Sequence, residues 1–433
     1  MSRLYTDTVP PVGISDLTVY VPDPCIESSE VVIQRSLDNE EKRLKLERAA
    51  SYTAQQRVRF PEVWQDSATL AGQACYALLQ DIAEERRRAL RFLGTGTETT
   101  ADHSKPVSAY VQGMMERAGY PLPETMSTFQ TQHACAGGSL AIFSIASQLA
   151  LSGRADESGI VLCTDIARYK PGSTAEITQG AGGVALLVEP NPRLISLDLG
   201  TAGYASRDVD DFFRPLGSET ARVKGRYSLR CYREALEGAF LDYCRRSSLE
   251  PRDALVGTDL FVLHVPYYSL PLEAMQWLLK KYLGLKKPEA EAFLDERGFQ
   301  ASIEPARVVG NLYSGSMFMA LQFLLHQQAQ QRGSGIEGRR ILFASYGSGN
   351  TMLVFSGTVV PGAVDVIQTW QPEAMLANAR SVPFSNYDNW VHRNCYDPSC
   401  NDALKAAAGT IPPGMLYLQS LREDGYREYS FSG

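Results

Sequence analysis

Segments with the pattern of strands alternate with segments with the pattern of helices along this chain of 433 residues, and the alternation restarts near the middle. In the first half, the continuous apolar run at 159–163 is typical of a buried strand and follows an apolar helix. In the second half, an amphipathic helix at 227–246 precedes a buried strand at 259–266. Such alternation favours an α/β sheet with helices on both faces. We therefore predict two similar α/β halves, residues 1–190 and 191–433.

The composition is that of an ordinary folded protein and excludes several classes of partner. Hydrophobic residues make up 44% and charged residues 21% of the sequence, and no run approaches the roughly 18 apolar residues that a membrane-spanning helix needs. The formal charge of -7 gives no electrostatic reason for binding nucleic acid or an anionic membrane. The first residues lack the pattern of a secretory signal, so we expect a cytoplasmic protein.

The eight cysteines are scattered along the chain without C-x-x-C spacing, which argues against a disulfide framework or a zinc site. Only Cys395 and Cys400 lie close together, and no second pair of Cys or His residues accompanies them. The phosphate-binding motif G-x-x-x-x-G-K is also absent from the sequence. We expect no metal and no permanently bound cofactor.

Cys135 stands directly before Ala136, Gly137, Gly138 and an apolar helix. A cysteine at a helix N-terminus has its thiolate favoured by the helix dipole and by free backbone N–H groups, and glycines let a substrate approach closely. These are the requirements of a nucleophile that forms a thioester. The alternative is that Cys135 is a small core residue in a tight turn.

His264 and Glu98 each follow a predicted strand, and active sites in such sheets gather at the carboxyl ends of strands. His264 ends the apolar run FVLH, where a purely structural histidine is the alternative. Glu98 lies in the turn GTGTETT. Partial burial would raise its pKa toward general acid–base use, whereas a solvated carboxylate would need no function.

Two further segments offer polar groups to a site. Asn311 in VVGNLYSGS precedes a helix and is either a functional residue or the N-cap of that helix. The glycines of SYGSGN, residues 345–350, allow backbone N–H groups to point into a cavity as an oxyanion hole. A simple Gly-rich hairpin is the alternative for this segment.

Nine short motifs together resemble the hydroxymethylglutaryl-coenzyme A synthase family, in the order of that family. They run from about residue 90 to the C-terminus and read GTGTETTADHSK, QHACAGG, TDIARY, QGAGGVALLV, DVDDFFRP, VLHVPY, GNLYSGS, SYGSG and YREYSF. The resemblance implies a thiolase-like fold whose two α/β halves stack in α-β-α-β-α layers. It also implies a homodimer.

The same resemblance implies functions for individual residues. Cys135 would carry an acetyl group, Glu98 would act as acid and base, and His264 would hold and polarise a second substrate. The supporting positions implied by the match are Asp102, Asp165, Tyr169, Asp211, Phe212, Asn311, Tyr346 and Ser348. The implied reaction adds the enolate of acetyl-Cys135 to the ketone of a β-ketoacyl thioester such as acetoacetyl-coenzyme A, before water releases the product.

The chain departs from this family where relatives that use free coenzyme A carry lysines for the cofactor's phosphates. Here Ser269 and Glu273 stand in that stretch. The acetyl donor is therefore either acetyl-coenzyme A, as in mevalonate formation, or an acyl carrier protein, as in polyketide β-branching. Ala136 also replaces the aromatic residue that the family usually carries after the cysteine.

Two competing interpretations remain at this point. A ketoacyl-carrier-protein synthase of the initiating type shares the fold and uses a Cys/His/Asn set that Cys135, His264 and Asn311 could supply. Glu98 argues against it, because decarboxylative condensation needs no base to form the carbanion. A noncatalytic subunit with the same fold is the second alternative, although it would have no reason to keep Cys135, Glu98 and His264.

Overall fold

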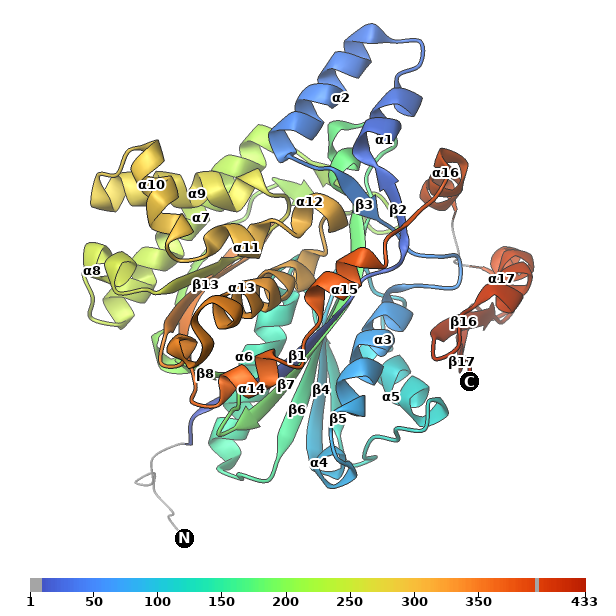
Figure 1. The fold of residues 1–433 in the computed structure, drawn as a ribbon. Helices are drawn as coiled ribbons and strands as arrows, with labels where there is room; N and C mark the ends of the chain where they lie inside the picture. Colours follow the sequence, from blue (N-terminus) through green and yellow to red (C-terminus); the bar gives the residue numbers. More distant parts are fainter. Residues whose placement is uncertain (1–9, 394–396) are drawn as a thin grey trace.

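The centre of the molecule is a mixed sheet of ten strands, seen in a computed structural model that describes residues 10–393 and 397–433 (Figure 1). Its strands are β1 (Val12–Tyr20), β4 (Leu90–Gly96), β5 (Ser127–Thr131), β6 (Ser158–Ala167), β7 (Gly180–Pro190), β8 (Ile195–Leu197), β9 (Gly203–Ser206), β12 (Leu260–Leu263), β13 (Arg340–Gly347) and β14 (Thr351–Val359). Their order is β12-β13-β14-β8-β1-β7-β6-β4-β5, and β9 also pairs with β14. The short β8 pairs with both β1 and β14, so it joins strands of the two predicted halves.

Three smaller sheets lie outside this one. Their strands are β2 (Pro24–Glu27), β3 (Arg57–Arg59) and β15 (Arg380–Ser381) in the first, β10 (Phe212–Phe213) and β11 (Arg222–Val223) in the second, and β16 (Leu416–Leu421) and β17 (Arg427–Phe431) in the third.

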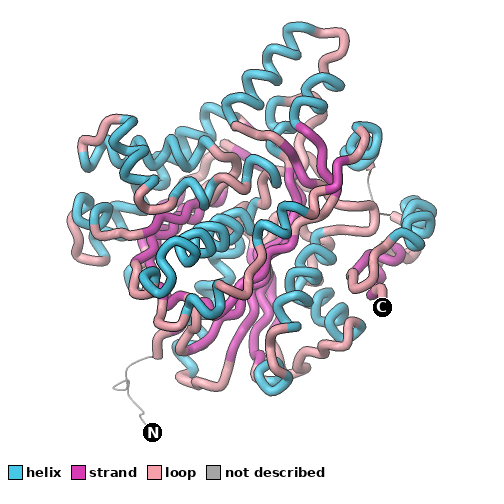
Figure 2. The backbone as a smooth tube through the Cα atoms, in the orientation of Figure 1, coloured by secondary structure: helices cyan, strands magenta, loops and turns pink. Residues whose placement is uncertain are grey.

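Helices lie on both sides of the sheet, which confirms the predicted α/β class (Figure 2). The first group comprises α1 (Ser28–Arg35), α2 (Glu40–Thr53), α3 (Ser67–Gln80), α4 (Glu84–Arg88), α5 (Val107–Arg117), α6 (Gly137–Ser152), α7 (Gly225–Arg246) and α8 (Pro251–Val256). The second comprises α9 (Ser269–Leu283), α10 (Lys287–Asp295), α11 (Phe299–Ile303), α12 (Ala306–Val309), α13 (Ser316–Arg332), α14 (Ala363–Ile367), α15 (Pro372–Ala377), α16 (Phe384–His392) and α17 (Asn401–Ala407). Short 3-10 helices are η1 (Thr174–Thr178), η2 (Leu199–Thr201), η3 (Tyr313–Gly315), η4 (Gly333–Ile336), η5 (Pro398–Cys400) and η6 (Ala408–Thr410).

Alternate residues of β6 pack against different layers of helices. Val161 and Cys163 belong to the large core that contains residues of α6 and α13. Ile160 and Leu162 belong to a second core formed with α3 and α5. This follows from the period of two in a strand, in which neighbouring side chains point to opposite faces. Every residue of the apolar run at 159–163 is therefore buried, as the sequence predicts.

The helix α6 is largely apolar and mostly buried, and Cys135 lies two residues before its first residue, Gly137. By length and composition alone the segment 134–152 could cross a membrane, but more than half of it is buried within the molecule. A helix that is apolar on most of its surface is typical of the interior of a large protein. Its position between β-strands and other helices explains the composition.

The segment 68–90, whose apolar spacing is helical, forms two helices. The first is α3, which ends at Gln80, and the second is α4, which ends at Arg88 before β4 begins at Leu90. Asp81 forms the C-cap of α3.

Candidate active site

The carboxyl ends of parallel strands carry the three residues that sequence reasoning places at the centre of the site. Strands β4, β5 and β6 run parallel to one another, as do β12 and β13. Glu98 follows β4, Cys135 lies between β5 and α6, and His264 follows β12. Cys135 packs in a buried cluster with Tyr169 and Phe212.

Two glycines let the Cys135 turn pack closely against neighbouring strands. A Cβ atom on Gly96 would lie 2.1 Å from the backbone nitrogen of Gly138, and one on Gly347 would lie 2.2 Å from the backbone oxygen of His133. No side chain fits at either position, because the obstructing atoms are backbone. The end of β4 and the SYGSGN segment therefore both lie directly against the turn that carries Cys135.

The surroundings of the Cys135 thiol oppose the effect of its position at a helix N-terminus. Burial, together with the negative charges of Glu98 and Asp165, raises the pKa of Cys135 well above its ordinary value. These effects oppose the helix dipole, which favours the thiolate.

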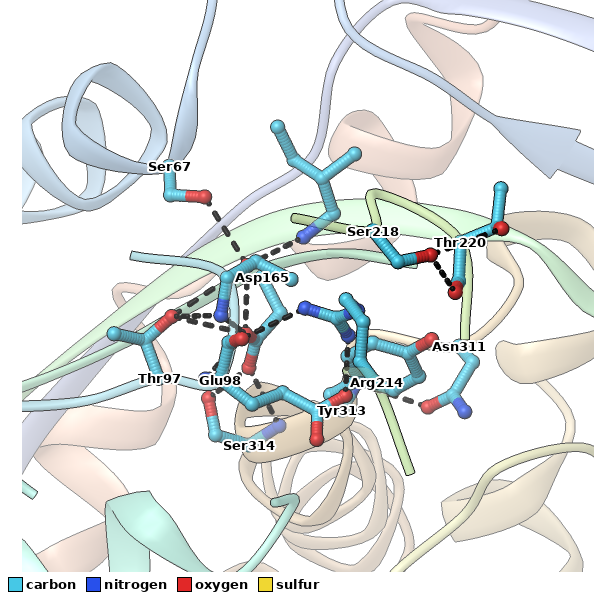
Figure 3. A network of polar contacts seen from close by, with 12 residues as sticks. Ser67, Thr97, Glu98, Asp165, Arg214, Ser218, Thr220, Asn311, Tyr313 and Ser314 are labelled. Atoms are coloured by element: carbon cyan, nitrogen blue, oxygen red, sulfur yellow. Dashed lines mark hydrogen bonds and ion pairs between the residues drawn. The ribbon is translucent and has the colours of Figure 1, made fainter. Parts of the chain in front are cut away.

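Glu98 faces the guanidinium group of Arg214 in a buried ion pair (Figure 3). Arg214 Nη2 donates to Glu98 Oε1 at 2.9 Å, and Arg214 Nη1 donates to the backbone oxygen of Glu98 at 2.7 Å. Burial raises the pKa of Glu98 to about 8, although the charge of Arg214 opposes the rise. The predicted direction of the shift is confirmed. A carboxyl group with such a pKa can take up and release protons near neutral pH.

Asp165 accepts six hydrogen bonds and ties the Glu98 turn to a second segment of the site (Figure 3). Its Oδ1 accepts from the backbone N–H groups of Glu98 and Thr99 and from the hydroxyls of Thr97 and Thr99, at 2.8–3.1 Å. Its Oδ2 accepts from the N–H and the hydroxyl of Ser314, at 3.0 and 2.6 Å. Asp165 is fully buried and positions its neighbours.

Asp211 holds the SYGSGN segment in place. Its Oδ2 accepts a hydrogen bond from the hydroxyl of Tyr346 at 2.7 Å, and its Oδ1 accepts one from the backbone N–H of Gly349 at 2.9 Å. Ser348 lies half-buried between these two contacts, in the turn that joins β13 to β14. Its function as an oxyanion-hole donor stays a prediction.

Three aromatic side chains enclose Cys135. The ring of Phe212 lies 6.3 Å from that of Tyr169 and 5.7 Å from that of Tyr313, all in edge-on arrangements. All three residues are buried with Cys135 in one cluster. An apolar wall of this kind excludes water and strengthens the electrostatic interactions inside it.

His264 is buried and neutral. Its Nδ1 lies 2.7 Å from Ser316 Oγ, and its backbone N–H donates to the oxygen of Ala344 at 2.8 Å. Burial lowers the pKa of His264 to about 3, so the ring carries no charge near neutral pH. Ala344 belongs to β13, the strand that ends against the Cys135 turn.

Asn311 and Asp102 each accept hydrogen bonds from nearby backbone N–H groups, and the Asn311 side chain also hydrogen-bonds Tyr169. The side-chain oxygen of Asn311 accepts from the N–H of Tyr313 at 2.9 Å, in the turn that leads into η3 and α13. Asp102 accepts from the N–H groups of Ser104 and Lys105, both at 2.7 Å, and these bonds lower its pKa. Asp102 thus stabilises the loop before α5 and takes no part in the Asp165 network. The functions predicted for both residues remain untested.

Sequence reasoning missed Arg214, Ser314 and Ser316. Arg214 lies in DVDDFFRP, and the two serines lie in GNLYSGS, motifs already noted for other residues. Each contacts a central residue of the site through its side chain. The sequence feature that could have identified these three residues is a charged or hydroxyl side chain inside a motif that matches the family.

Across residues 10–393 and 397–433, no group of three or more His, Cys, Asp or Glu side chains is arranged to hold a metal ion. Cys25, Cys75, Cys135, Cys163, Cys231 and Cys244 are free thiols. Cys395 lies outside the described residues.

Two regions of the chain match known family descriptions. Residues 9–193 match "Hydroxymethylglutaryl-coenzyme A synthase N terminal", and residues 278–430 match "Hydroxymethylglutaryl-coenzyme A synthase C terminal". A hydroxymethylglutaryl-CoA synthase of Enterococcus faecalis is 27% identical over 403 residues, which cover 92% of this chain and 97% of that protein.

Solved structures are similar over nearly the whole chain. MvaS in complex with 3-hydroxy-3-methylglutaryl coenzyme A is 30% identical, with a TM-score of 0.83, and the match covers 98% of this chain and 100% of that one. The curacin biosynthetic pathway HMG synthase in complex with acetyl donor-ACP shares the fold, with a TM-score of 0.82 at 23% identity over 97% of this chain and 100% of that one. These matches confirm the predicted thiolase-like fold.

Proposed function

This chain belongs to the hydroxymethylglutaryl-coenzyme A synthase family, and we propose that it is a carbon–carbon bond-forming acyltransferase that joins an acetyl group on Cys135 to an acetoacetyl thioester. The observation that carries this proposal is the position of Glu98, a buried carboxyl group that Arg214 and Asp165 hold near Cys135. Burial also raises the pKa of Glu98 to about 8. Acetyl methyl protons are weakly acidic, so their removal needs a base in this range inside a site that excludes water.

The first half-reaction loads Cys135. The Cys135 sulfur attacks the carbonyl carbon of an acetyl thioester, and the bond from that carbon to the donor's sulfur breaks. The thiol proton of Cys135 ends on the departing sulfur, so no charge accumulates in the buried site. The apolar wall around Cys135 protects the new thioester from early hydrolysis.

The second half-reaction forms the carbon–carbon bond. Glu98 removes a proton from the acetyl methyl group, and backbone N–H groups of Cys135 and Ser348 stabilise the enolate oxygen. The enolate carbon attacks the ketone carbon of the acetoacetyl thioester. The ketone oxygen becomes an alkoxide, which His264 faces, and takes the proton held by Glu98. Water then cleaves the thioester to Cys135 and releases a 3-hydroxy-3-methylglutaryl thioester.

Arg214→Gln should shift the pH dependence of the reaction to higher pH. The cationic neighbour lowers the pKa of Glu98, so its removal raises that pKa above its present value of about 8. Glu98 acts as a base only when ionised, and fewer molecules then hold the ionised form at neutral pH. The rate should fall near pH 7 and recover as the pH rises. The measurement is kcat/KM against pH, with Arg214→Lys as a control that keeps the charge. An unchanged profile in Arg214→Gln would contradict the function given to the ion pair.

The acetyl donor in this proposal is acetyl-coenzyme A, which the likeness to MvaS with bound 3-hydroxy-3-methylglutaryl coenzyme A supports. One observation favours an acyl carrier protein as a second candidate. Ser269 Oγ donates to the backbone oxygen of Tyr52 at 2.5 Å, and the hydroxyl of Tyr52 donates to Glu273 Oε2 at 3.1 Å. Relatives that use free coenzyme A carry lysines in this stretch, whereas this exposed cluster holds the carboxylate of Glu273. A carboxylate repels the phosphates of free coenzyme A, whereas a carrier protein brings no adenosine phosphates.

The proposal is tested by product analysis with each donor. The protein is incubated with acetoacetyl-coenzyme A and either acetyl-coenzyme A or an acetyl-loaded carrier protein, and the products are identified by mass spectrometry. A 3-hydroxy-3-methylglutaryl thioester formed from acetyl-coenzyme A supports the first donor, and one formed only from the carrier protein supports the second. Formation of neither product, with an acetyl group still transferred to Cys135, would overturn the condensation.

We also propose a homodimer that forms through β5. Among the described residues, this strand is the last of the sheet and pairs only with β4, and its residues 127–131 are exposed or half-buried. An unpaired strand edge is a ready surface for a second chain. Light scattering in solution should give twice the mass of the chain, and a monomer would contradict this assembly.

The competing functions fit the site less well. A decarboxylating ketoacyl synthase has no use for a base, whereas Glu98 is buried, paired with Arg214 and oriented through Asp165. A noncatalytic subunit has no use for a carboxyl group whose pKa is raised into the catalytic range.

A further inference from the structure

Ser316 makes the hydrogen bond that orients the ring of His264. Ser316 Oγ and His264 Nδ1 are 2.7 Å apart, and both residues are buried, with exposed fractions of 0% and 2%. The backbone N–H of Val265 also points at Ser316 Oγ, at 3.2 Å. The hydroxyl thus has one backbone donor on one side and the imidazole on the other.

These contacts fix the direction of the hydrogen bond between the two side chains. The N–H of Val265 can only donate, so it occupies an acceptor position of Ser316 Oγ. Within the described part of the chain, the hydroxyl proton has no hydrogen-bond acceptor other than His264 Nδ1. Buried hydroxyl groups are hydrogen-bonded in folded proteins, so the proton of the fully buried Ser316 points at Nδ1. Nδ1 therefore accepts and carries no proton of its own.

The other ring nitrogen must then hold the proton. His264 is neutral, because burial lowers its pKa to about 3. A neutral imidazole has one N–H, and with Nδ1 as the acceptor that N–H is on Nε2. Nε2 has no hydrogen-bond partner among the residues that the structure describes, so it is free to donate to a substrate.

We propose that Ser316 is a positioning residue that fixes His264 in its Nε2–H form, so that the ring donates a hydrogen bond to the ketone oxygen of the acceptor. This inference rests on the proposed condensation. It adds Ser316 as the group that determines which ring nitrogen of His264 carries the proton. In this form His264 acts as an electrophile and does not accept a proton at Nε2, which leaves Glu98 as the base of the carbon–carbon bond-forming step.

The inference predicts different effects on the two half-reactions. Ser316→Ala removes the donor to Nδ1, so the ring distributes its proton between both nitrogens. The condensation rate should fall about 10-fold or more, since loss of a preorganised donor to a developing oxyanion costs up to about 10²- to 10³-fold. Acetylation of Cys135 should stay within about twofold, because no ketone is involved at that stage.

The test reads the tautomer directly in the full-length protein. Long-range proton–nitrogen NMR on protein with ¹⁵N-labelled histidine distinguishes Nε2–H from Nδ1–H, and His264→Gln identifies the signal. The wild type should show Nε2–H, and Ser316→Ala should show a mixture or Nδ1–H. The matched control is Tyr232→Phe, which removes the hydroxyl that donates to the His264 backbone oxygen at 3.0 Å and leaves the ring contact intact. That control should keep Nε2–H.

Two results would overturn the inference. One is an Nδ1–H signal in the wild type, which needs no variant and no substrate. The other is Ser316→Ala with an unchanged tautomer and an unchanged condensation rate. Failure of the proposed function looks different, because it would leave the Nε2–H signal in place while no condensation product forms from any donor.

Discussion

Glu98→Gln should stop condensation while Cys135 still becomes acetylated. General bases contribute about 10²- to 10⁴-fold, and we expect a loss of this size in the formation of the 3-hydroxy-3-methylglutaryl thioester. Loading should continue, because transfer of the acetyl group breaks no carbon–hydrogen bond. Removal of the Glu98 charge also removes one of the charges that raise the pKa of Cys135, which favours attack by its sulfur. The variant should therefore accumulate acetyl-Cys135.

Exchange of the acetyl methyl protons with deuterated water measures proton removal by Glu98 separately from loading and condensation. In the wild type without an acceptor, Glu98 should remove and return these protons, so deuterium appears in the acetyl group. Glu98→Gln should lose this exchange. His264→Ala provides the matched comparison, since it should lose condensation and keep exchange. Equal exchange in Glu98→Gln and the wild type would mean that another group is the base.

Asp165→Asn should impair both stability and catalysis. The carboxylate accepts from the backbone N–H of Glu98 and Thr99 on one oxygen and from that of Ser314 on the other. Whichever way the amide points, its NH₂ group faces at least one of these donors. An unsatisfied buried group costs about 1–3 kcal/mol, so the free energy of unfolding should fall by at least this amount.

The catalytic effect of Asp165→Asn follows from the displaced Glu98 turn. A shift of about 1 Å in a catalytic group can cost about 10²-fold, and we expect a loss of kcat of that order in the folded variant. Denaturant unfolding and steady-state kinetics measure the two effects. Asp156→Asn is the control, because the side chain of Asp156 is 74% exposed and its loss should change neither quantity. Asp165→Asn with wild-type stability and kcat would show that its six hydrogen bonds do not hold the site.

The fold class, and the positions of Glu98, Cys135 and His264 after strands, could be predicted because both depend on patterns along the chain. The catalytic functions of these three residues stay predictions. Apolar runs mark strands and helices, and residues that follow parallel strands reach the same edge of a sheet. Cys135, Glu98 and His264 follow from that rule together with the matched motifs. The division of the chain at residue 190 stays a prediction, since β8 joins both sets of strands in one sheet.

The contacts that tune the site could not be predicted in the same way. Arg214 lies 116 residues from its partner Glu98, and no local pattern links the two. Ser314 and Ser316 belong to one motif, yet Ser314 bonds Asp165 while Ser316 bonds His264, because η3 and the start of α13 turn them in different directions. Such contacts depend on tertiary packing, which the pattern of residues near each position does not reveal.

Neighbourhood in the sequence also proved a weak guide to spatial contact. Asp102 shares a motif with Glu98, but its carboxylate caps the turn at Ser104 and Lys105. The position of Cys135 before a helix was likewise a weak guide to the pKa of its thiol. A helix N-terminus favours a negative charge, yet burial and the nearby carboxylates of Glu98 and Asp165 outweigh it.

The central claim is that Cys135 carries the acetyl group, and the mass of the intact protein tests it most directly. The protein is incubated with acetyl-coenzyme A and, separately, with an acetyl-loaded carrier protein. Cys163→Ala serves as a matched variant, because Cys163 is also buried and free. We predict an acetyl-sized gain in the wild type and in Cys163→Ala and none in Cys135→Ala. A gain that persists in Cys135→Ala, or no gain in the wild type from either donor, would contradict the account.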